Sequence, residues 1–121
     1  MSVQIGDIFW MSVKYPSTGE IETRPVVVYG FVDEEPLIAS FATITRSEIE
    51  DFDGKFDKWK VPIFKYREAN LQPSYVKTNC IATISKSYIE TLVKIGHMER
   101  IDLNHVIERI EEFIDSDEEP W

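Results

Sequence analysis

The stretch Pro25-Val26-Val27-Val28-Tyr29-Gly30-Phe31 is almost entirely apolar. A strand covered on one face alternates apolar and polar residues, whereas a strand covered on both faces forms a nearly continuous apolar run. The stretch therefore predicts a strand that is buried on both sides. The segment Asp33-Glu34-Glu35-Pro36 follows it and is expected to end the strand.

Five further strands are predicted around this one, because β-branched and aromatic residues stand between turn-forming clusters. They are Asp7–Lys14, Leu37–Thr45, a short strand with Trp59, Val61 and Ile63, then Tyr75–Ser85 and Leu92–Ile95. A loop that opens at Tyr15-Pro16-Ser17-Thr18-Gly19 is expected to reach Arg24, and Ser47–Phe52 to form one helical turn. Pro62 cannot donate to a ladder, so the short strand should be an edge or carry a bulge. Alternation in the fifth strand places one set of side chains on a common face: Val76, Thr78, Cys80, Ala82 and Ile84.

A helix is predicted at the C-terminal end. Asp102 is a favourable N-cap residue, and Ile101 and Val106 flank it in the arrangement of a hydrophobic staple. Apolar residues then recur at helical spacing: Leu103, Val106, Ile107, Ile110, Phe113 and Ile114. This stripe predicts a helix over about 102–114 that packs against the sheet or a second subunit. The fold class is therefore mainly β with a C-terminal helix (α+β), arranged as a small, strongly twisted antiparallel barrel or half-barrel.

Length and composition indicate one domain. The chain has 121 residues, of which 43% are hydrophobic, so it can bury a core. We assign residues 1–114 to a single domain and residues 115–121 to an acidic tail. No apolar run approaches the roughly 18 residues of a membrane span, and the first residues do not resemble a signal peptide, so a cytoplasmic location is expected. One cysteine and two histidines are too few for a disulfide framework or a closed zinc site, so neither a metal nor a cofactor is expected.

Charge is distributed unevenly along the chain. The net charge is -9, but seven acids and one base from Glu108 onward supply -6 of it. Between Lys55 and Arg67 the balance reverses, and basic residues alternate with aromatic ones. Phosphates attract cations and unpaired bases stack on aromatic rings, so this stretch is a candidate for RNA contact. The candidate contacts are Lys58, Lys60, Lys65 and Arg67. Lysines on an edge strand that prevent aggregation are the structural alternative.

Familiar catalytic motifs are missing from the sequence: it contains no Walker loop, no HExxH and no G-x-S-x-G. His97 and His105 are interpreted as capping or surface residues, and Cys80 as a small core residue. Taken alone, Arg24 could grip a phosphate bidentately or be solvated.

Several segments in order resemble the MazF/PemK family, the toxins of type II toxin–antitoxin modules. They are Gly6-Asp7-Ile8, Arg24-Pro25-Val26-Val27-Val28, Ile44-Thr45, Ser74 with Val76 before Ile81-Ala82-Thr83-Ile84, and Lys94-Ile95-Gly96-His97-Met98. The resemblance spans nearly the whole chain. One departure is Cys80, which stands where the family has a Gln.

The resemblance implies an SH3-like barrel, a homodimer and a metal-independent, sequence-selective endoribonuclease that cleaves single-stranded RNA. It further implies that an antitoxin neutralises the protein by laying an acidic segment over the RNA groove. The family's catalytic arginine and its Thr/Ser fall on Arg24 and Thr45. Attack by the RNA 2'-OH would also need a proton acceptor, for which Glu20 and Glu22 are candidates.

Two other functions stay open from the sequence. One is a catalytically inactive RNA- or protein-binding module on the same barrel, which would tolerate loss of Arg24 or Thr45. The other is a gyrase poison of the CcdB type, in which the terminal Trp121 would matter more than Arg24. The acidic tail could also occupy the groove of its own dimer, as an antitoxin does.

Overall fold

The computed structural model describes residues 3–14, 18–33, 37–50, 54 and 57–119. Its elements are β1 (Asp7–Lys14), β2 (Ile21–Val32), β3 (Ile38–Thr45), β4 (Lys60–Pro62), β5 (Tyr75–Ser85), α1 (Lys86–Ile89), β6 (Lys94–His97) and α2 (Arg100–Asp115). The residues expected to form turns at 15–17 and 34–36 lie outside the described ranges, as do 51–52 of the expected helical turn. Residues 47–50 of that turn are not helical.

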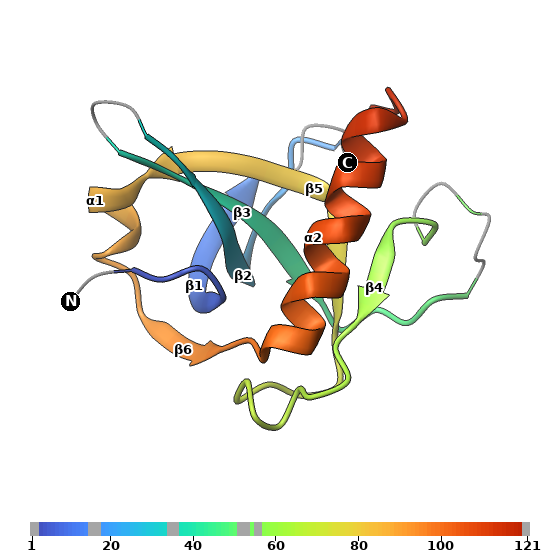
Figure 1. Ribbon diagram of the computed structural model, residues 1–121, viewed down its shortest axis with the longest axis horizontal. Helices are drawn as coiled ribbons and strands as arrows, with labels where there is room; N and C mark the ends of the chain where they lie inside the picture. Colours follow the sequence, from blue (N-terminus) through green and yellow to red (C-terminus); the bar gives the residue numbers. More distant parts are fainter. Residues whose placement is uncertain (1–2, 15–17, 34–36, 51–53, 55–56, 120–121) are drawn as a thin grey trace.

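The strands form one antiparallel sheet in the order β4-β5-β3-β2-β1-β6. The sheet curves strongly, and α2 packs across it beside β5 and β4 (Figure 1). The predicted class, mainly β with a C-terminal helix, is confirmed. β4 carries Pro62 and lies at the edge of the sheet, as its missing N–H required. Neither described helix is long and apolar enough to cross a membrane.

Strand β2 begins earlier than predicted. Residues 21–24 were expected to be loop, but they pair with β1, and Met11 lies opposite Arg24. The turn-rich residues before them misled the prediction, because they indicate the opening of a loop, and this loop was expected to reach Arg24. Arg24 is therefore held inside a strand and not at a loop-to-strand junction.

A bulge interrupts β5 where it pairs with β3. Ala42 lies opposite Ile81, but the next residue, Thr43, lies opposite Lys77, so three residues of β5 are left out of the ladder. The predicted alternation over the whole strand is therefore wrong. Asn79, which strict alternation places on the face opposite to Val76 and Cys80, is buried like them, whereas Ala82, predicted to share their face, is exposed.

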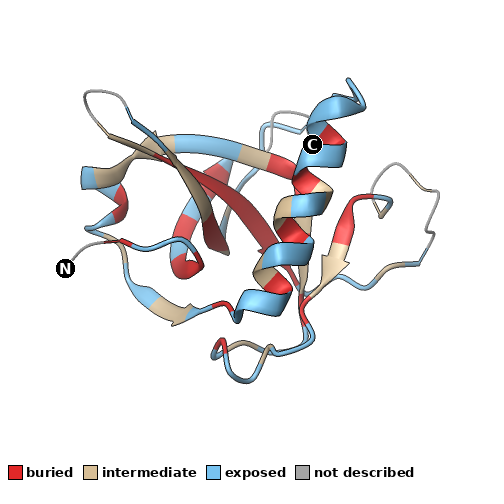
Figure 2. Cartoon of the chain, viewed as in Figure 1, coloured by how far each residue is buried: buried red, intermediate tan, exposed pale blue. Residues whose placement is uncertain are grey.

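Two apolar cores lie on opposite faces of the curved sheet, because neighbouring residues of a strand belong to different cores. Strand β3 is buried along nearly its whole length (Figure 2). The first core is enclosed by the sheet and α1, and contains Phe9, Val26 and Phe41. The second lies under α2 and contains Ile8, Val27 and Ile110. Val26 and Val27 are adjacent and both fully buried, which confirms that this strand is covered on both sides.

Helix α2 begins at Arg100, two residues before the predicted start. Its N-cap is Glu99, whose side chain makes no capping hydrogen bond. Asp102 lies inside the first turn, and its carboxylate accepts hydrogen bonds from the backbone N–H groups of Phe64 (3.0 Å) and Lys65 (2.9 Å). Asp102 therefore ties the segment after β4 to the helix. The expected staple is also wrong, because Ile101 is exposed.

The segment between β4 and β5 reaches the opposite end of the sheet. The Asn70 side-chain amide donates to the carbonyl oxygen of Ile95 in β6 (2.8 Å). Asn70 has a φ of 61°, a left-handed conformation that asparagine tolerates better than most residues. Gly96 allows this segment to lie close against β6, because a Cβ at residue 96 would overlap the carbonyl oxygen of Ala69. Within the described residues, this segment links the two ends of the sheet, β4 and β6.

Candidate active site

Arg24 and Thr45 lie opposite each other where the β2–β3 ladder ends. Val26 pairs with Thr43 in that ladder, so two residues further along each strand the register places Arg24 across from Thr45, with both side chains on one face. Thr45 is buried, whereas the Arg24 side chain is 41% exposed. Both residues line two hollows, which meet at this point. The structure brings the two predicted catalytic residues together.

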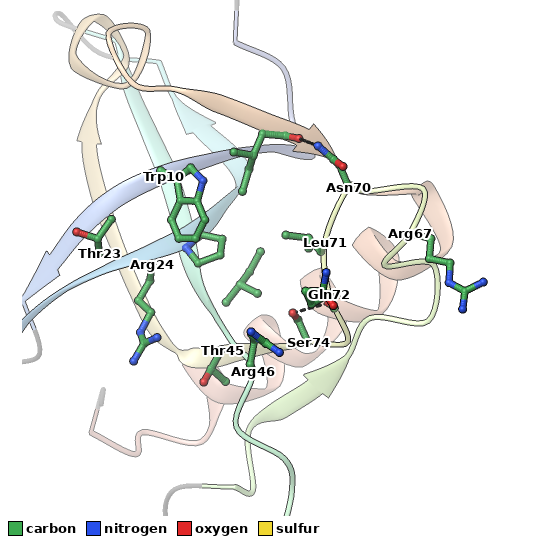
Figure 3. A pocket seen from close by; sticks show the side chains of 13 residues that line it. Trp10, Thr23, Arg24, Thr45, Arg46, Arg67, Asn70, Leu71, Gln72 and Ser74 are labelled. Atoms are coloured by element: carbon green, nitrogen blue, oxygen red, sulfur yellow. Dashed lines mark hydrogen bonds between the residues drawn. The ribbon is translucent and has the colours of Figure 1, made fainter.

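The larger hollow is a groove of about 700 Å³ between β2, β3, β6 and the segment after β4 (Figure 3). Its cationic lining consists of Arg24, Arg46 and Arg67, and Trp10, a residue that is 44% exposed, contributes an indole ring. None of the described residues that line the groove is acidic. The groove is thus locally positive although the chain carries a net charge of -9.

The smaller hollow has a volume of about 220 Å³ and contains both predicted proton acceptors, Glu20 and Glu22. Glu22 Oε2 accepts hydrogen bonds from Arg24 Nε (2.9 Å) and Nη2 (2.6 Å). The two residues are two positions apart on one strand face, so this ion pair fixes the guanidinium above the hollow. Glu20 precedes the strand, and its backbone N–H donates to Thr18 Oγ1 (3.2 Å). The two carboxylates therefore differ in that Glu22 forms the ion pair with Arg24.

Thr45 is the last residue of β3, and its hydroxyl oxygen accepts a hydrogen bond from the backbone N–H of Ser47 (3.1 Å). A threonine hydroxyl has one donor and two acceptor positions. That contact uses an acceptor position and leaves the hydroxyl hydrogen as the group that Thr45 can offer to a bound oxygen.

The four basic residues predicted to contact RNA do not share a surface. Arg67 lines the groove. Lys65 is exposed, but it lines neither hollow. Lys58 forms an ion pair with Glu118 of the acidic tail (3.1 Å), at the far end of α2. Lys55 and Phe56 of the same stretch lie outside the described residues.

Lys60 is buried, with a side chain that is only 4% exposed. Its ammonium lies 2.7 Å from the Asp57 carboxylate and donates to Ser47 Oγ and the Glu48 carbonyl. These contacts tie β4 to the segment after β3. A buried and paired ammonium is unavailable to a phosphate, so Lys60 is not part of the groove surface.

Several groove and hollow residues were not predicted from the sequence: Trp10, Arg46, Asn70, Gln72 and Lys77. Arg46 directly follows Thr45, so its position was a usable signal. Trp10 was not distinguishable from a core aromatic, because it occupies an ordinary strand position. Lys77 could not have been found by pattern, since the bulge in β5 decides which residue of β3 it faces.

The two histidines and Cys80 lie outside both hollows. The ring of His105 packs edge-on against Phe64, and Cys80 is buried beside Thr43. His97 Nδ1 lies 2.8 Å from the buried carboxylate of Asp7. In the described ranges no group of three His, Cys, Asp or Glu side chains is placed to hold a metal ion.

Asp7 anchors the start of β1. Burial favours a raised pKa for its carboxyl, but hydrogen bonds from the Gln4 backbone N–H, His97 and Lys94 lower the pKa below its ordinary value. Lys94 Nζ lies 3.1 Å from Asp7 Oδ1. The aspartate of the Gly6-Asp7-Ile8 segment is thus a structural residue that joins β1 to β6.

Comparison with solved structures supports the fold. The MazE–MazF crystal structures from Deinococcus radiodurans, Form-II and Form-III, both match with a TM-score of 0.61 at 10% identity, covering 95% of this chain and 97% and 98% of theirs. The Mycobacterium tuberculosis toxin MazF-mt6 matches with a TM-score of 0.59 at 20% identity, covering 95% of this chain and 99% of that one. The comparison with curated proteins gives no significant match.

A family model described as PemK-like, MazF-like toxin of type II toxin-antitoxin system matches residues 4–114. This range includes every strand and all but the last residue of α2. The match covers most of the chain and agrees with the fold of the solved toxins. The chain therefore belongs to the PemK-like, MazF-like toxins of type II toxin-antitoxin systems.

Proposed function

We propose that this toxin is a metal-independent, sequence-selective endoribonuclease that cleaves single-stranded RNA in the cytoplasm by attack of the 2'-OH on the adjacent phosphate. The observation that carries the proposal is the position of Arg24 and Thr45 between a positively charged groove and a hollow with two carboxylates. The scissile phosphate would lie at this boundary, with flanking nucleotides in the groove.

Arg24 would bind the phosphate. Its planar guanidinium matches two phosphate oxygens, keeps its charge at any physiological pH, and stabilises the additional negative charge of the phosphorane. The ion pair with Glu22 holds it in place before RNA arrives. The Thr45 hydroxyl would donate a hydrogen bond to a phosphate oxygen or orient the 2'-OH.

A carboxylate of the smaller hollow would accept the 2'-OH proton. Glu20 and Glu22 both line this hollow, and their substitution should affect RNA binding and cleavage differently. Glu22→Gln weakens the pair that orients Arg24, so it should reduce both RNA affinity and cleavage rate. Glu20→Gln leaves that pair intact and should reduce the rate alone if Glu20 is the base. Single-turnover rates of the two variants at saturating RNA, where affinity no longer contributes, identify the base.

The groove offers a basis for sequence selectivity. Trp10 presents a half-exposed ring on which a base could stack, and such stacking contributes about 1–3 kcal/mol without strong base preference. Gln72 and Asn70 supply amide groups that can hydrogen-bond base edges. Stacking would give affinity, and the amides would discriminate between bases.

Two partners are part of the proposal. A cognate antitoxin would neutralise the toxin by placing an acidic segment in the positive groove, in competition with RNA. A second copy of the chain would form a homodimer. Ile101 and Ile114 on α2, and Val93 beside β6, are more than half exposed and would be covered in an assembly. Light scattering coupled to size exclusion tests the dimer.

The decisive experiment incubates the purified protein with a long single-stranded RNA in EDTA and maps the cleaved ends. Wild-type protein should cut at discrete sites and leave 2',3'-cyclic phosphate and 5'-hydroxyl ends. Arg24→Ala and Thr45→Val should each reduce cleavage at least about 100-fold, because each removes a group that stabilises the transition state. Arg100→Ala is the control, since it removes the same charge from an exposed position on α2.

Other outcomes identify the alternatives. Intact RNA that is bound but never cut would indicate a non-catalytic binding module. DNA cleavage that requires gyrase, and that survives Arg24→Ala, would indicate a gyrase poison. Cleavage that requires an added divalent cation would contradict the metal-independent mechanism.

A further inference from the structure

Lys77 projects from β5 into the smaller hollow, beside the residues proposed to carry out catalysis. It lies opposite Thr43 of β3, two residues from Thr45 on the same strand face. Together with Glu22, Arg24 and Thr45 it lines the hollow of about 220 Å³. Three strands therefore direct charged or hydroxyl groups into one small space.

The surroundings of Lys77 favour release of its proton. The side chain is half-buried, and burial lowers the pKa of its ammonium; the charges of Lys60 in β4 and Arg24 in β2 lower it further. Glu22 and Cys80 act in the opposite direction. Burial raises the pKa of the Cys80 thiol, so this residue stays neutral near pH 7 and supplies no negative charge.

Two ion pairs are found among the charged residues around Lys77. Glu22 forms an ion pair with Arg24, and Asp57 forms one with Lys60. Glu20 is the other acid that lines the hollow. Lys77 thus lies among two other cations and two hollow carboxylates, one of which is bound to Arg24.

The proposed reaction lacks a group that protonates the leaving oxygen. Arg24 cannot fill this role, because a guanidinium does not release its proton at physiological pH. A threonine hydroxyl is also too weak an acid. The Lys77 ammonium is the group of the hollow that carries a transferable proton and has an environment that promotes its loss.

We propose that Lys77 is a further catalytic residue, the general acid that protonates the 5'-oxygen of the departing nucleotide. This assignment rests on the proposed ribonuclease function. In the step, the 2'-oxygen forms a bond to phosphorus while the bond from phosphorus to the 5'-oxygen breaks. The 2'-OH proton passes to a carboxylate of the hollow, and a proton of Lys77 Nζ passes to the 5'-oxygen. The carboxylic acid then loses its proton to water and the amine regains one.

A substrate with a sulfur leaving atom tests this role directly. A thiolate departs without protonation, so an RNA with a bridging 5'-sulfur at the mapped cleavage site does not need the acid. Single-turnover rates would be measured on this RNA and on its ordinary oxygen counterpart. Lys77→Met should cleave the ordinary RNA about 100-fold more slowly than wild type, the lower end of general acid contributions. It should cleave the sulfur-containing RNA at nearly the wild-type rate.

Two companion variants separate proton transfer from charge and from folding. Lys77→Arg keeps the positive charge but cannot donate its proton, so it should remain slow on the ordinary RNA and fast on the sulfur-containing RNA. Lys86→Met removes an ammonium from α1, far from the hollow, and should leave both rates unchanged. A fast rate on the sulfur-containing RNA also demonstrates that each variant is folded and binds substrate.

The pH profile gives an independent readout. The wild-type rate on ordinary RNA should fall as pH rises through the pKa of Lys77, and this alkaline decline should vanish in Lys77→Met. Equal loss of rate on both RNAs, or full activity of Lys77→Arg, would overturn the assignment in favour of a charge effect. Unchanged cleavage by Lys77→Met would also overturn it. A wild-type protein that binds both RNAs and cleaves neither would instead refute the proposed ribonuclease function, and the assignment with it.

Discussion

Asp102 holds the groove-forming segment to α2, and its removal should destabilise the protein by about 2–4 kcal/mol. The residue is fully buried, and its two carboxylate oxygens accept hydrogen bonds from the backbone N–H groups of Phe64 and Lys65. A hydrogen bond to a charged group contributes roughly 1.5–3 kcal/mol, and Asp102→Ala loses two of them. Two such bonds would sum to about 3–6 kcal/mol. Both hydrogen bonds are only partly buried, so water can satisfy the two amides in the variant, and this lowers the expected loss to about 2–4 kcal/mol.

Urea unfolding followed by circular dichroism measures this loss. Asp102→Asn keeps one oxygen acceptor but turns an amide donor toward the second N–H, so its stability should lie between those of wild type and Asp102→Ala. Glu108→Ala, an exposed acid on the same helix, is the control and should change stability by less than about 0.5 kcal/mol. Because the segment carries Arg67 and Gln72, the RNA affinity of Asp102→Ala should also fall.

Amide hydrogen exchange makes the test local. Exchange at Phe64 and Lys65 should accelerate in Asp102→Ala more than exchange elsewhere in the sheet. The reasoning is refuted if Asp102→Ala and Glu108→Ala have the same stability, or if the two amides exchange no faster than in wild type.

Two further predictions concern the junction of β1 and β6. The pKa of Asp7 lies below its ordinary value of 3.8, so its ionised form stabilises the fold fully above pH 3.8, and this stabilisation is lost as pH falls below that value. Asp7→Asn should therefore lower the Tm at pH 7, where His97 and Lys94 lose their partner, and the difference from wild type should shrink in acid; an equal difference at pH 7 and pH 3 would contradict this. Gly96→Ala should lower the Tm by an amount equivalent to about 1–3 kcal/mol, because the added Cβ overlaps the carbonyl oxygen of Ala69 and pushes β6 from the neighbouring segment. A variant as stable as wild type would show that the segment moves aside freely.

The regular strands could be predicted from the sequence because their signals are local. The boundaries of β1 and β5 agree with the predicted ranges, since β-branched and aromatic residues stand between clear turn signals. The start of β2 was missed, because the turn-rich cluster before it was interpreted as a loop that reaches Arg24, whereas residues 21–24 pair with β1. The short helix α1 was not predicted either, although Ser85 caps it.

Residues with tertiary partners were the main source of error. An aspartate before an apolar stripe is typical of an N-cap, and nothing local shows that Asp102 binds the backbone of a segment 37 residues away. Likewise, closeness in sequence suggested that Lys58, Lys60 and Arg67 share a surface. They instead lie before, within and after the edge strand β4, and contact the acidic tail, the interior and the groove, respectively.

The candidate site was predictable only in part. Arg24 and Thr45 followed from resemblance to a family, and their proximity follows from the register of two adjacent strands. The role of Lys77 depends on a bulge, which alternation cannot reveal. Glu118 of the acidic tail pairs with Lys58, and no described residue of the tail lines the groove, whereas Trp121 lies outside the described residues.

Among the described residues, Asn70 links the segment after β4 to β6 by one side-chain hydrogen bond and not by a ladder of backbone hydrogen bonds. Where a ladder joins two strands, widening the space between them breaks several hydrogen bonds together. Here the contact between the two ends of the sheet rests on the side chain of Asn70 and the close fit of Gly96 against Ala69. Asn70 and Ile95 also line the groove. The wall of the groove can therefore move at this contact while the strands keep their backbone hydrogen bonds. An RNA strand and a bulkier protein segment could then occupy the same groove at different widths.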